Sequence, residues 1–317
     1  MSKEYNDLLF QVARLYYEQG KTQAEIGLII HSSRPTVSRL LKEARECGIV
    51  DIKLNYPFER DYTLEEEFQK NFDLKEVRVL KSYNQKIEEV LKGLGFFAAE
   101  YLDSLIVDGD IISCSYGRTV ASTIQALHPE RKLNIMVVQM IGALGVENPF
   151  IDGPDLVRLL SDKYGGRYRY LLAPLVVSDK IAKESLVNQI RFQETIKLSQ
   201  SARIGLCGIG GMNEDTPSPI WTNYISIHEW ADLRRQGAIG HMGAYFFGED
   251  GEIIDSEMNE RVIGLGLHLQ REIPYMIAVA GGENKASSIR AALKGRYMNV
   301  LVTDDSAASK ILELSNQ

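Results

Sequence analysis

The sequence of 317 residues has only three cysteines, Cys47, Cys114 and Cys207, and no two of them have the C-x-x-C spacing. Their number and positions argue against a disulfide framework and against a zinc site, so we expect no metal. No apolar run approaches the roughly eighteen residues needed to span a bilayer. The amino terminus also has no signal-peptide core. We therefore expect a soluble protein of the reducing cytoplasm.

An excess of positive charge is also missing, since 36 Lys and Arg stand against 43 Asp and Glu, a net charge of −7. A surface that is basic throughout, as in proteins that coat nucleic acid, is thereby excluded. Residues 31–45 differ from this average, with four basic side chains against the single acidic Glu43. A basic patch focused on an acidic protein indicates contact with a polyanion in one place only.

The first sixty residues predict three helices. Residues 7–18 place apolar side chains at helical spacing before Gly20. A second, short helix begins with a capping box, in which Thr22 and Glu25 satisfy free backbone N–H groups. The third is expected from about Arg34 to Cys47, with Pro35 in its first turn, where a missing N–H costs nothing.

The second and third helices, joined by a short turn, form the pattern of a helix-turn-helix. In the third helix Val37, Leu40, Leu41 and Ala44 are predicted to be buried, which leaves hydroxyl and basic side chains for the major groove. The candidate DNA-binding residues are Arg34, Thr36, Ser38, Arg39 and Lys42. Alternation of apolar and polar residues at 49–57 predicts a small strand, or wing. The alternative is a solvated helix in an ordinary three-helix bundle.

A charged, helix-favouring stretch, "DYTLEEEFQKNF" at 61–72, follows. It places Leu64, Phe68 and Phe72 on one face, which predicts a linker helix over 59–74 between a DNA-binding domain at 1–58 and a larger domain at 75–317. Such a face suits either the core of the large domain or a dimer seam, and both remain open.

From residue 75 onward, strands alternate with helices, as in "LKEVRVL", "DIISCS", "RYRYLLAPLVV" and "MNVLVTDD". Nearly continuous apolar runs are typical of strands that are covered on both faces. The fold class expected is therefore α/β: a small helix-turn-helix domain, possibly winged, followed by a larger Rossmann-like domain with a mostly parallel sheet.

Three polar glycine loops come after predicted strands, where open α/β sheets bind ligands. The loop "SYGRT" opens into a helix, so that backbone N–H groups, two hydroxyls and an arginine converge as in a phosphate site. The loop "AGGENKASS" adds the charge of Lys285 at another helix start. The third loop is "GALG" at 142–145. The candidate effector-binding residues of the three loops are Ser115, Tyr116, Gly117, Arg118, Thr119, Gly142, Gly145, Gly281, Gly282 and Lys285.

Each glycine loop alone has a simpler explanation, because strand-to-helix turns need glycine in any α/β protein. Three of them at one edge of the sheet favour a small anionic ligand. A dinucleotide is excluded, since "GIGGMN" at 208–213 does not have the G-x-G-x-x-G spacing and no Walker lysine motif occurs.

The two halves together resemble the SorC family of bacterial sugar-binding transcriptional regulators, over essentially the whole chain. The resemblance is carried by "ARLYYEQGKTQAEI", "SRPTVSRLLKEARECGIV", "SYGRT", "GAIGHMGAYFFGEDGEII", "NERVIG" and "VAGGENKASSIRAALKGRYMNVLVTDD". It implies a repressor or activator whose second domain is similar to sugar-phosphate isomerases and aminosugar-phosphate deaminases. A phosphorylated sugar is then the effector, and a homodimer or homotetramer is the expected assembly.

Residue by residue, the resemblance assigns Ser115, Gly117, Arg118 and Thr119 to the phosphate and Lys285 to the ligand. It also points to the loop at 240–260, where His241 stands at a position that is acidic in some relatives. This substitution bears on which sugar is bound.

An enzyme of the related deaminase type would need a proton-transfer pair near the sugar. The D-G-H residues of those enzymes are absent here, since Met212, Asn213 and Glu214 follow "GIGG", and the "GALG" loop has no lysine for an imine. No catalytic residue and no cofactor are therefore expected. The function expected is a DNA-binding regulator of a carbohydrate-utilisation operon, controlled by a phosphorylated sugar or polyol. The alternatives are a sugar-phosphate enzyme with an appended DNA-binding domain and a structural nucleoid protein.

Overall fold

The computed structural model describes residues 3–51, 58–83, 85–145, 148–212 and 217–315. The chain divides into two compact units, Met1–Pro57 and Phe58–Gln317. Residues 52–57 of the predicted wing at 49–57 lie outside the described residues.

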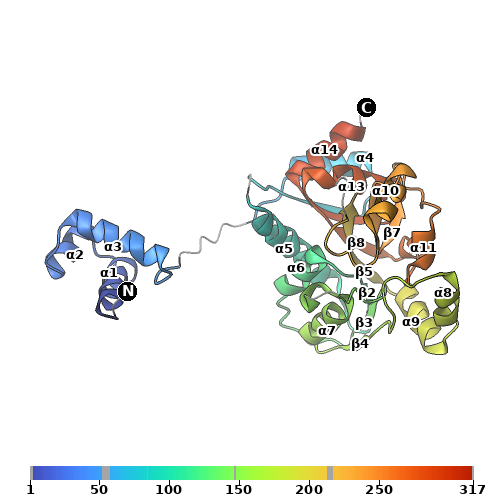
Figure 1. The fold of residues 1–317 in the computed structure, drawn as a ribbon, viewed down its shortest axis with the longest axis horizontal. Helices are drawn as coiled ribbons and strands as arrows, with labels where there is room; N and C mark the ends of the chain where they lie inside the picture. The colour runs from blue at the N-terminus through green and yellow to red at the C-terminus, as the bar shows by residue number, and fades with distance from the viewer. Residues whose placement is uncertain (1–2, 52–57, 84, 146–147, 213–216, 316–317) are drawn as a thin grey trace. The chain divides into compact units, whose positions relative to one another are not determined.

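The first unit consists of α1 (Lys3–Tyr17), α2 (Gln23–Ile29) and α3 (Arg34–Glu46), as Figure 1 shows. The predicted capping box of Thr22 and Glu25 is present at the start of α2. Ser33 caps α3 by accepting a hydrogen bond from the backbone N–H of Thr36. The core of the unit contains Leu9, Val12, Ala13, Leu15, Ile26, Val37, Leu40, Leu41 and Ala44. The three-helix prediction is confirmed, including the four buried positions of the third helix.

The second unit is built on a parallel sheet in the order β1-β9-β8-β5-β2-β3-β4. Its strands are β1 (Glu76–Leu80), β2 (Ile111–Cys114), β3 (Met136–Gln139), β4 (Arg167–Arg169), β5 (Ile204–Gly211), β8 (Tyr275–Val279) and β9 (Val300–Asp304). The apolar runs predicted to be buried strands are buried in β2, β3, β8 and β9. The predicted α/β class with a parallel sheet is therefore confirmed.

Helices cover both faces of this sheet. One face carries α5 (Ile87–Leu105), α6 (Arg118–Ala126) and α7 (Gly153–Tyr164). The core of the other face includes side chains of α4 (Tyr62–Asn71), α10 (Ile227–Arg235), α13 (Ala286–Lys294) and α14 (Asp305–Ser315). The remaining helices are α8 (Lys180–Val187), α9 (Ile190–Gln200), α11 (Glu257–Arg261) and α12 (Leu267–Gln270), with short 3-10 turns at Pro149–Ile151 and Glu283–Lys285.

Two stretches differ from the sequence-based expectation. The "RYRYLLAPLVV" run forms a strand only over β4, and beyond it makes single bridges at Pro174 and Val176, because proline has no N–H to give to a ladder. The expected loop at 240–260 instead contains a hairpin of β6 (Gly240–Met242) and β7 (Tyr245–Phe247). Strand β6 pairs antiparallel with the end of β5, so that His241 lies opposite Gly210.

The predicted linker helix, α4, is part of the second unit. Phe68 is fully buried in the core of that unit, and Leu64 and Phe72 pack against the same core. The apolar face of the helix is therefore core and is not available as a dimer seam. The sequence did not indicate this role, because acidic side chains are usually exposed. In α4, however, Glu65 is buried as well.

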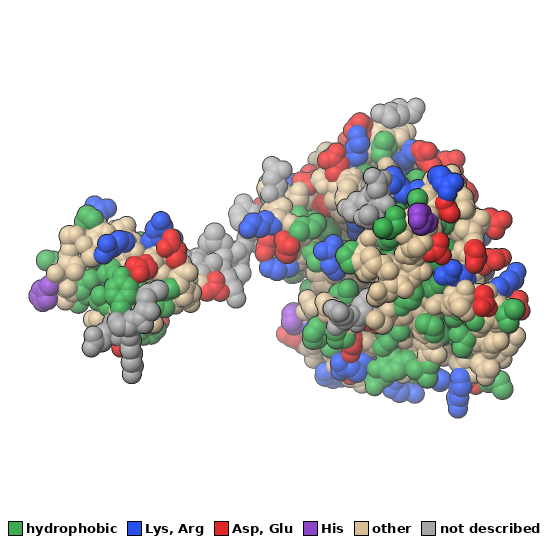
Figure 2. Space-filling view, viewed as in Figure 1, with side chains coloured by type: hydrophobic (Ala, Val, Ile, Leu, Met, Phe, Trp, Pro, Cys, Tyr) green, Lys and Arg blue, Asp and Glu red, His purple; other side chains and the backbone are tan. Residues whose placement is uncertain are grey.

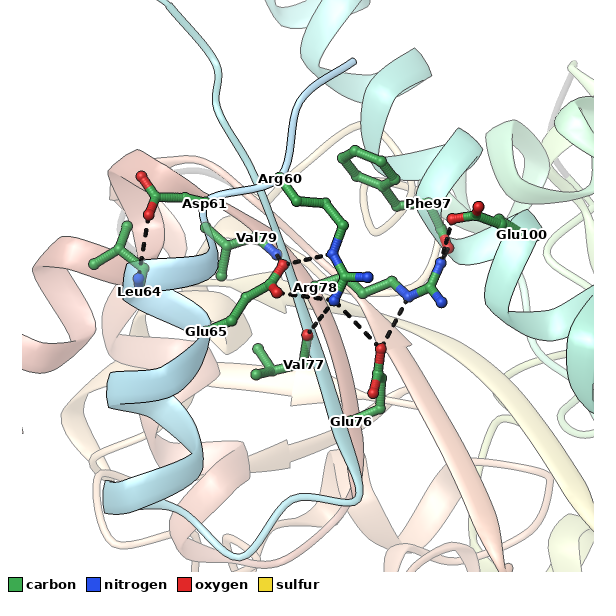
Figure 3. A network of polar contacts seen from close by, with 10 residues as sticks. All are labelled: Arg60, Asp61, Leu64, Glu65, Glu76, Val77, Arg78, Val79, Phe97 and Glu100. Carbon is green, nitrogen blue, oxygen red and sulfur yellow. Dashed lines mark hydrogen bonds and ion pairs between the residues drawn. The ribbon is translucent and has the colours of Figure 1, made fainter. Parts of the chain in front are cut away.

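A polar network fixes the start of the second unit (Figure 3). The guanidinium of Arg60 donates from Nε and Nη2 to the two carboxylate oxygens of Glu65, each at 2.8 Å. Glu65 also accepts from the backbone N–H of Val79 in β1, at 2.8 Å. Glu76 then joins Arg60 to Arg78, at 3.4 and 3.1 Å. A paired guanidinium and carboxylate thus clamp α4 to β1 at the point where the chain leaves the first unit.

We expect Glu65→Gln to lower the free energy of unfolding of the second unit by about 1.5–3 kcal/mol, since it removes a charged acceptor from Arg60. Urea unfolding followed by tryptophan fluorescence measures this, because both tryptophans, Trp221 and Trp230, lie in the second unit. The matched control is Glu66→Gln, an exposed neighbour on the same helix, which should change stability by less than about 0.5 kcal/mol. Equal effects of the two substitutions would show that the clamp does not stabilise the unit.

Candidate functional site

Three of the predicted effector residues meet around three consecutive residues at the carboxyl end of β5. At Gly208, an added Cβ would lie 2.9 Å from the hydroxyl oxygen of Thr119. At Ile209, the backbone carbonyl accepts a hydrogen bond from Lys285 Nζ at 3.1 Å. At Gly210, an added Cβ would lie 2.0 Å from His241 Nε2.

This arrangement explains why positions 208 and 210 are glycine. Side chains at positions two apart on a strand point to the same side, so Thr119 and His241 occupy the space of the side chains that Gly208 and Gly210 do not have. Two residues of strand span roughly 6–7 Å. Lys285 reaches β5 between them. The site therefore offers a hydroxyl, an ammonium and an imidazole along this short length of strand.

The "SYGRT" loop connects β2 to α6. Gly117 precedes the helix with a φ of +111°, and no side chain caps the first turn of α6. The N–H of Gly117 itself donates to the carbonyl of Ile151 at 3.0 Å. Gly117 thus shapes the turn, and its own N–H is already bonded within the protein. The N–H groups of Arg118 and Thr119, in the first turn of the helix, have no partner within the helix.

Two other side chains of this loop are buried, those of Ser115 and Tyr116. The phenol oxygen of Tyr116 has no hydrogen-bond partner among the described residues. Burial raises the pKa of Tyr116, and Cys207, Tyr224 and Asp152 add to the effect, so the phenol stays neutral. It is a donor and acceptor without a protein partner in the part of the chain described.

The "AGGENKASS" loop connects β8 to α13 and is tied to the end of β9. The N–H of Gly282 donates to Asp304 Oδ2 at 2.6 Å, and the N–H of Ala307 donates to Asp304 Oδ1 at 3.0 Å. An added Cβ on Gly281 would lie 2.1 Å from the same carboxylate. Asp304 is not among the residues predicted from the sequence. Its signal was an acidic residue directly after a buried strand, at the edge where the glycine loops lie.

Lys285 is held in an electropositive, low-dielectric position. Burial lowers the pKa of Lys285, the charge of Arg118 lowers it further, and Asp304 opposes both. Two cations are therefore placed close together with one carboxylate, which is already bonded to backbone N–H groups. Such an arrangement is unfavourable in the empty protein and favourable once an anion binds.

The "GALG" loop lies beyond β3 and is tightly fixed. The N–H of Gly145 donates to Asp152 at 2.9 Å, and Gly145 has a φ of +61°. Gly142 packs so closely on Pro174 that an added Cβ would lie 2.1 Å from its carbonyl oxygen. The hydroxyl of Tyr224 donates to the carbonyl of Leu144. Asp152 and Tyr224 were also missed by the sequence analysis, because nothing local to either residue marks it.

The predicted DNA-binding residues lie on α3. Arg34, Ser38, Arg39 and Lys42 are exposed, and Figure 2 shows basic side chains on the surface of the first unit. Thr36 is different, since it is half-buried and its hydroxyl lies 2.8 Å from that of Ser33 in the helix cap. Lys42 forms an exposed ion pair with Glu46 at 3.5 Å, which a phosphate can replace at little cost.

The described ranges contain neither a metal-binding cluster nor a membrane-spanning helix. No group of three or more His, Cys, Asp or Glu side chains there could hold a metal ion. No helix in the same ranges is long and apolar enough to cross a membrane.

Comparison with known proteins gives matches over nearly the full length. The family described as "Putative sugar-binding domain" matches residues 56–313. The deoxyribonucleoside regulator of Bacillus subtilis (strain 168) is 31% identical over 312 residues, covering 98% of this chain and 99% of that protein. The transcriptional regulator LsrR of Enterobacter sp. (strain 638) is 32% identical, covering 98% and 94%. The crystal structure of the full-length sorbitol operon regulator SorC from Klebsiella pneumoniae aligns with a TM-score of 0.76 at 30% identity, covering 96% of this chain and 98% of that one.

A small helical unit followed by a parallel-sheet sugar-binding domain defines this chain as a sugar-responsive transcriptional regulator. The chain belongs to the SorC/DeoR family of such regulators, as the sequence resemblance indicated. Its relatives are transcriptional regulators and not enzymes, in agreement with the missing proton-transfer pair.

Proposed function

We propose that the chain binds operator DNA of a carbohydrate-utilisation operon under the control of a phosphorylated sugar or polyol. The observation that carries the proposal is the placement of Thr119, Lys285 and His241 at three consecutive residues of β5. A ligand there would meet groups suited to phosphate at one end and groups suited to hydroxyls at the other.

The phosphate is proposed to lie at the start of α6. The helix N-terminus supplies backbone N–H groups, and Arg118, Thr119 and Lys285 supply two charges and a hydroxyl. The charge of Arg118 lowers the pKa of Lys285, so the two cations lie close together. A phosphate dianion placed between them would neutralise a repulsion that the empty site retains.

The sugar is proposed to extend toward His241 and the loop at 142–145. Tyr224 connects these two parts of the site, because its hydroxyl bonds the loop while its ring lies against Trp221, next to His241. The phenol of Tyr116, which is buried and has no partner among the described residues, lies near Tyr224. No lysine occurs in the "GALG" loop, which favours noncovalent binding over a covalent imine.

The exposed face of α3 is proposed to enter the major groove. Arginine can grip guanine with two hydrogen bonds, and Lys42 and Ser38 suit phosphates. We also propose a homodimer or homotetramer, because two-fold pairing lets two such helices read two half-sites.

Control by the effector is proposed to act by a population shift. Asp304 links the ligand loop at Gly282 to β9, and β9 pairs with β1 beside the Arg60 clamp. A ligand that prefers one arrangement of these strands changes the population of arrangements offered to the DNA-binding unit. Coupling of about 1–3 kcal/mol would change operator affinity about 5- to 150-fold.

A thermal-shift panel tests the proposal. Phosphorylated sugars and polyols are compared with the same compounds without phosphate and with inorganic phosphate. Binding to the native state raises stability by about 2.7 kcal/mol at a hundred times Kd, so at least one phosphorylated compound should raise the melting temperature of the second unit while its dephosphorylated partner does not. Equal shifts with and without phosphate would refute a phosphorylated effector, and turnover of any compound would favour the enzyme alternative.

A further inference from the structure

The imidazole of His241 receives a hydrogen bond from a buried tryptophan. Trp221 Nε1 donates to His241 Nε2 at 3.0 Å. Trp221 is fully buried, its ring stands edge-on to the imidazole with centroids 5.1 Å apart, and it packs on Phe246 at 4.9 Å. The indole is therefore fixed by packing, and its N–H has a single direction.

This bond fixes the tautomer of the histidine. An indole nitrogen is only ever a donor, so His241 Nε2 has to be the acceptor and carries no proton. In a neutral imidazole the proton is then on Nδ1, which becomes a donor. Burial, and to a smaller extent the charge of Lys285, lowers the pKa of His241 to about 3. The ring is thus neutral throughout the physiological range and presents one N–H.

The remaining nitrogen of His241 is left for a ligand. Among the described residues none is bonded to Nδ1, and His241 keeps a small exposed surface although most of the residue is buried. Its ring edge at Nε2 packs over Gly210, next to the residue whose carbonyl holds Lys285. Two cations, Lys285 and Arg118, lie on the same side of the fold. A partner for Nδ1–H therefore has to be an acceptor atom, and a cation would be repelled.

We propose that Trp221 is a positioning residue that holds His241 as a neutral Nδ1–H donor toward the sugar. The donor selects effectors that present an uncharged oxygen at this end, and it disfavours amino sugars, whose ammonium group offers no acceptor. The inference rests on the proposed function, because it takes the phosphate to be bound at Lys285.

The first test needs no ligand. Nitrogen NMR of the full chain distinguishes the two neutral tautomers, and His241→Phe identifies the signal among the five histidines. We expect the Nδ1–H tautomer, unchanged between about pH 5 and 9. Trp221→Phe, which keeps an aromatic ring and loses the donor, should convert it to a mixture of tautomers. An Nε2–H tautomer in the unchanged protein, or titration within this range, overturns the inference.

The second test compares inorganic phosphate, glucose 6-phosphate and glucosamine 6-phosphate by calorimetry. Glucose 6-phosphate should bind more tightly than glucosamine 6-phosphate. Loss of one neutral hydrogen bond in His241→Phe should weaken the binding of glucose 6-phosphate about 3- to 10-fold, with the affinity for inorganic phosphate unchanged. His241→Asn keeps an N–H donor near the position of Nδ1, so it should restore most of the affinity for glucose 6-phosphate that His241→Phe loses.

The outcomes separate the two proposals. Absence of binding by all three phosphates would count against the proposed phosphate site and this inference with it. Binding of phosphate and of both sugar phosphates that does not change in the His241 and Trp221 variants would overturn only the present inference. A merely structural role for Trp221 predicts lower stability with no change in tautomer, and NMR detects that difference.

Discussion

Replacing Lys285 by methionine is expected to weaken binding of phosphorylated sugars by about 10- to 150-fold, the effect of losing a hydrogen bond to a charged group. Operator binding without effector should be unchanged, since Lys285 lies in the second unit, remote in sequence from α3. Calorimetry measures the first quantity, and a DNA-binding titration with and without effector measures the second. Methionine keeps the length and apolar stem of lysine, so packing is largely retained.

The same substitution should leave the ligand-free protein at least as stable. The pKa of Lys285 is lowered mainly by burial and then by Arg118, so at neutral pH the charge is destabilising, and this penalty decreases as pH rises through the lowered pKa toward the ordinary value for lysine. The matched control is Lys294→Met at the end of α13, the helix that Lys285 precedes, where the ammonium of Lys294 pairs with Asp250 at the surface. Lys294→Met should not alter ligand binding, and a large effect there, or none in Lys285→Met, would mean that the phosphate site is misplaced.

Replacing Arg39 by alanine is expected to weaken operator binding about 5- to 150-fold, corresponding to the roughly 1–3 kcal/mol of a good contact from arginine to a base. The helix should remain folded, because Arg39 is exposed and the buried positions of α3 are untouched. Titration of labelled operator DNA at several salt concentrations measures the change. It also distinguishes a base contact, which alters sequence preference, from a phosphate contact, which lowers the salt dependence.

Arg14→Ala is the control for this experiment. Arg14 is an exposed arginine on α1, outside the proposed groove-facing set. Removing it lowers the charge of the unit by the same amount, so a purely non-specific attraction predicts equal losses for both variants. A larger loss for Arg39→Ala supports recognition by α3, and equal losses would refute it. Circular dichroism of both variants verifies that the helices are intact.

The helix-turn-helix could be predicted in detail because its signals are local. A capping box, a proline in the first turn and an apolar stripe each lie within a few residues, and the structure places all of them as expected. The parallel sheet was predictable for a similar reason, since a fully buried strand appears as one apolar run. Glycine loops following such strands then indicated the edge of the sheet at which Thr119 and Lys285 meet.

The rest of the site depends on contacts between residues far apart in the chain. Asp304 and Gly282 are joined only because β8 and β9 are neighbours, and Trp221 reaches His241 only because β6 folds back along β5. The role of α4 was left open for a related reason. An apolar face has the same sequence pattern whether it packs in a core or in a dimer seam. Only the structure shows that the face of α4 packs against the core of the second unit.

The two glycines of β5, Gly208 and Gly210, have a consequence for how new ligand specificities arise. The strand supplies a floor without side chains at two positions, and each wall of the site is contributed by another segment. The wall beside His241 belongs to the β6–β7 hairpin, which lies off the main path of the sheet. At the proposed site, exchanging residues of that hairpin would therefore change the contacts to the sugar, while the proposed phosphate contacts at α6 and the central sheet would stay unchanged.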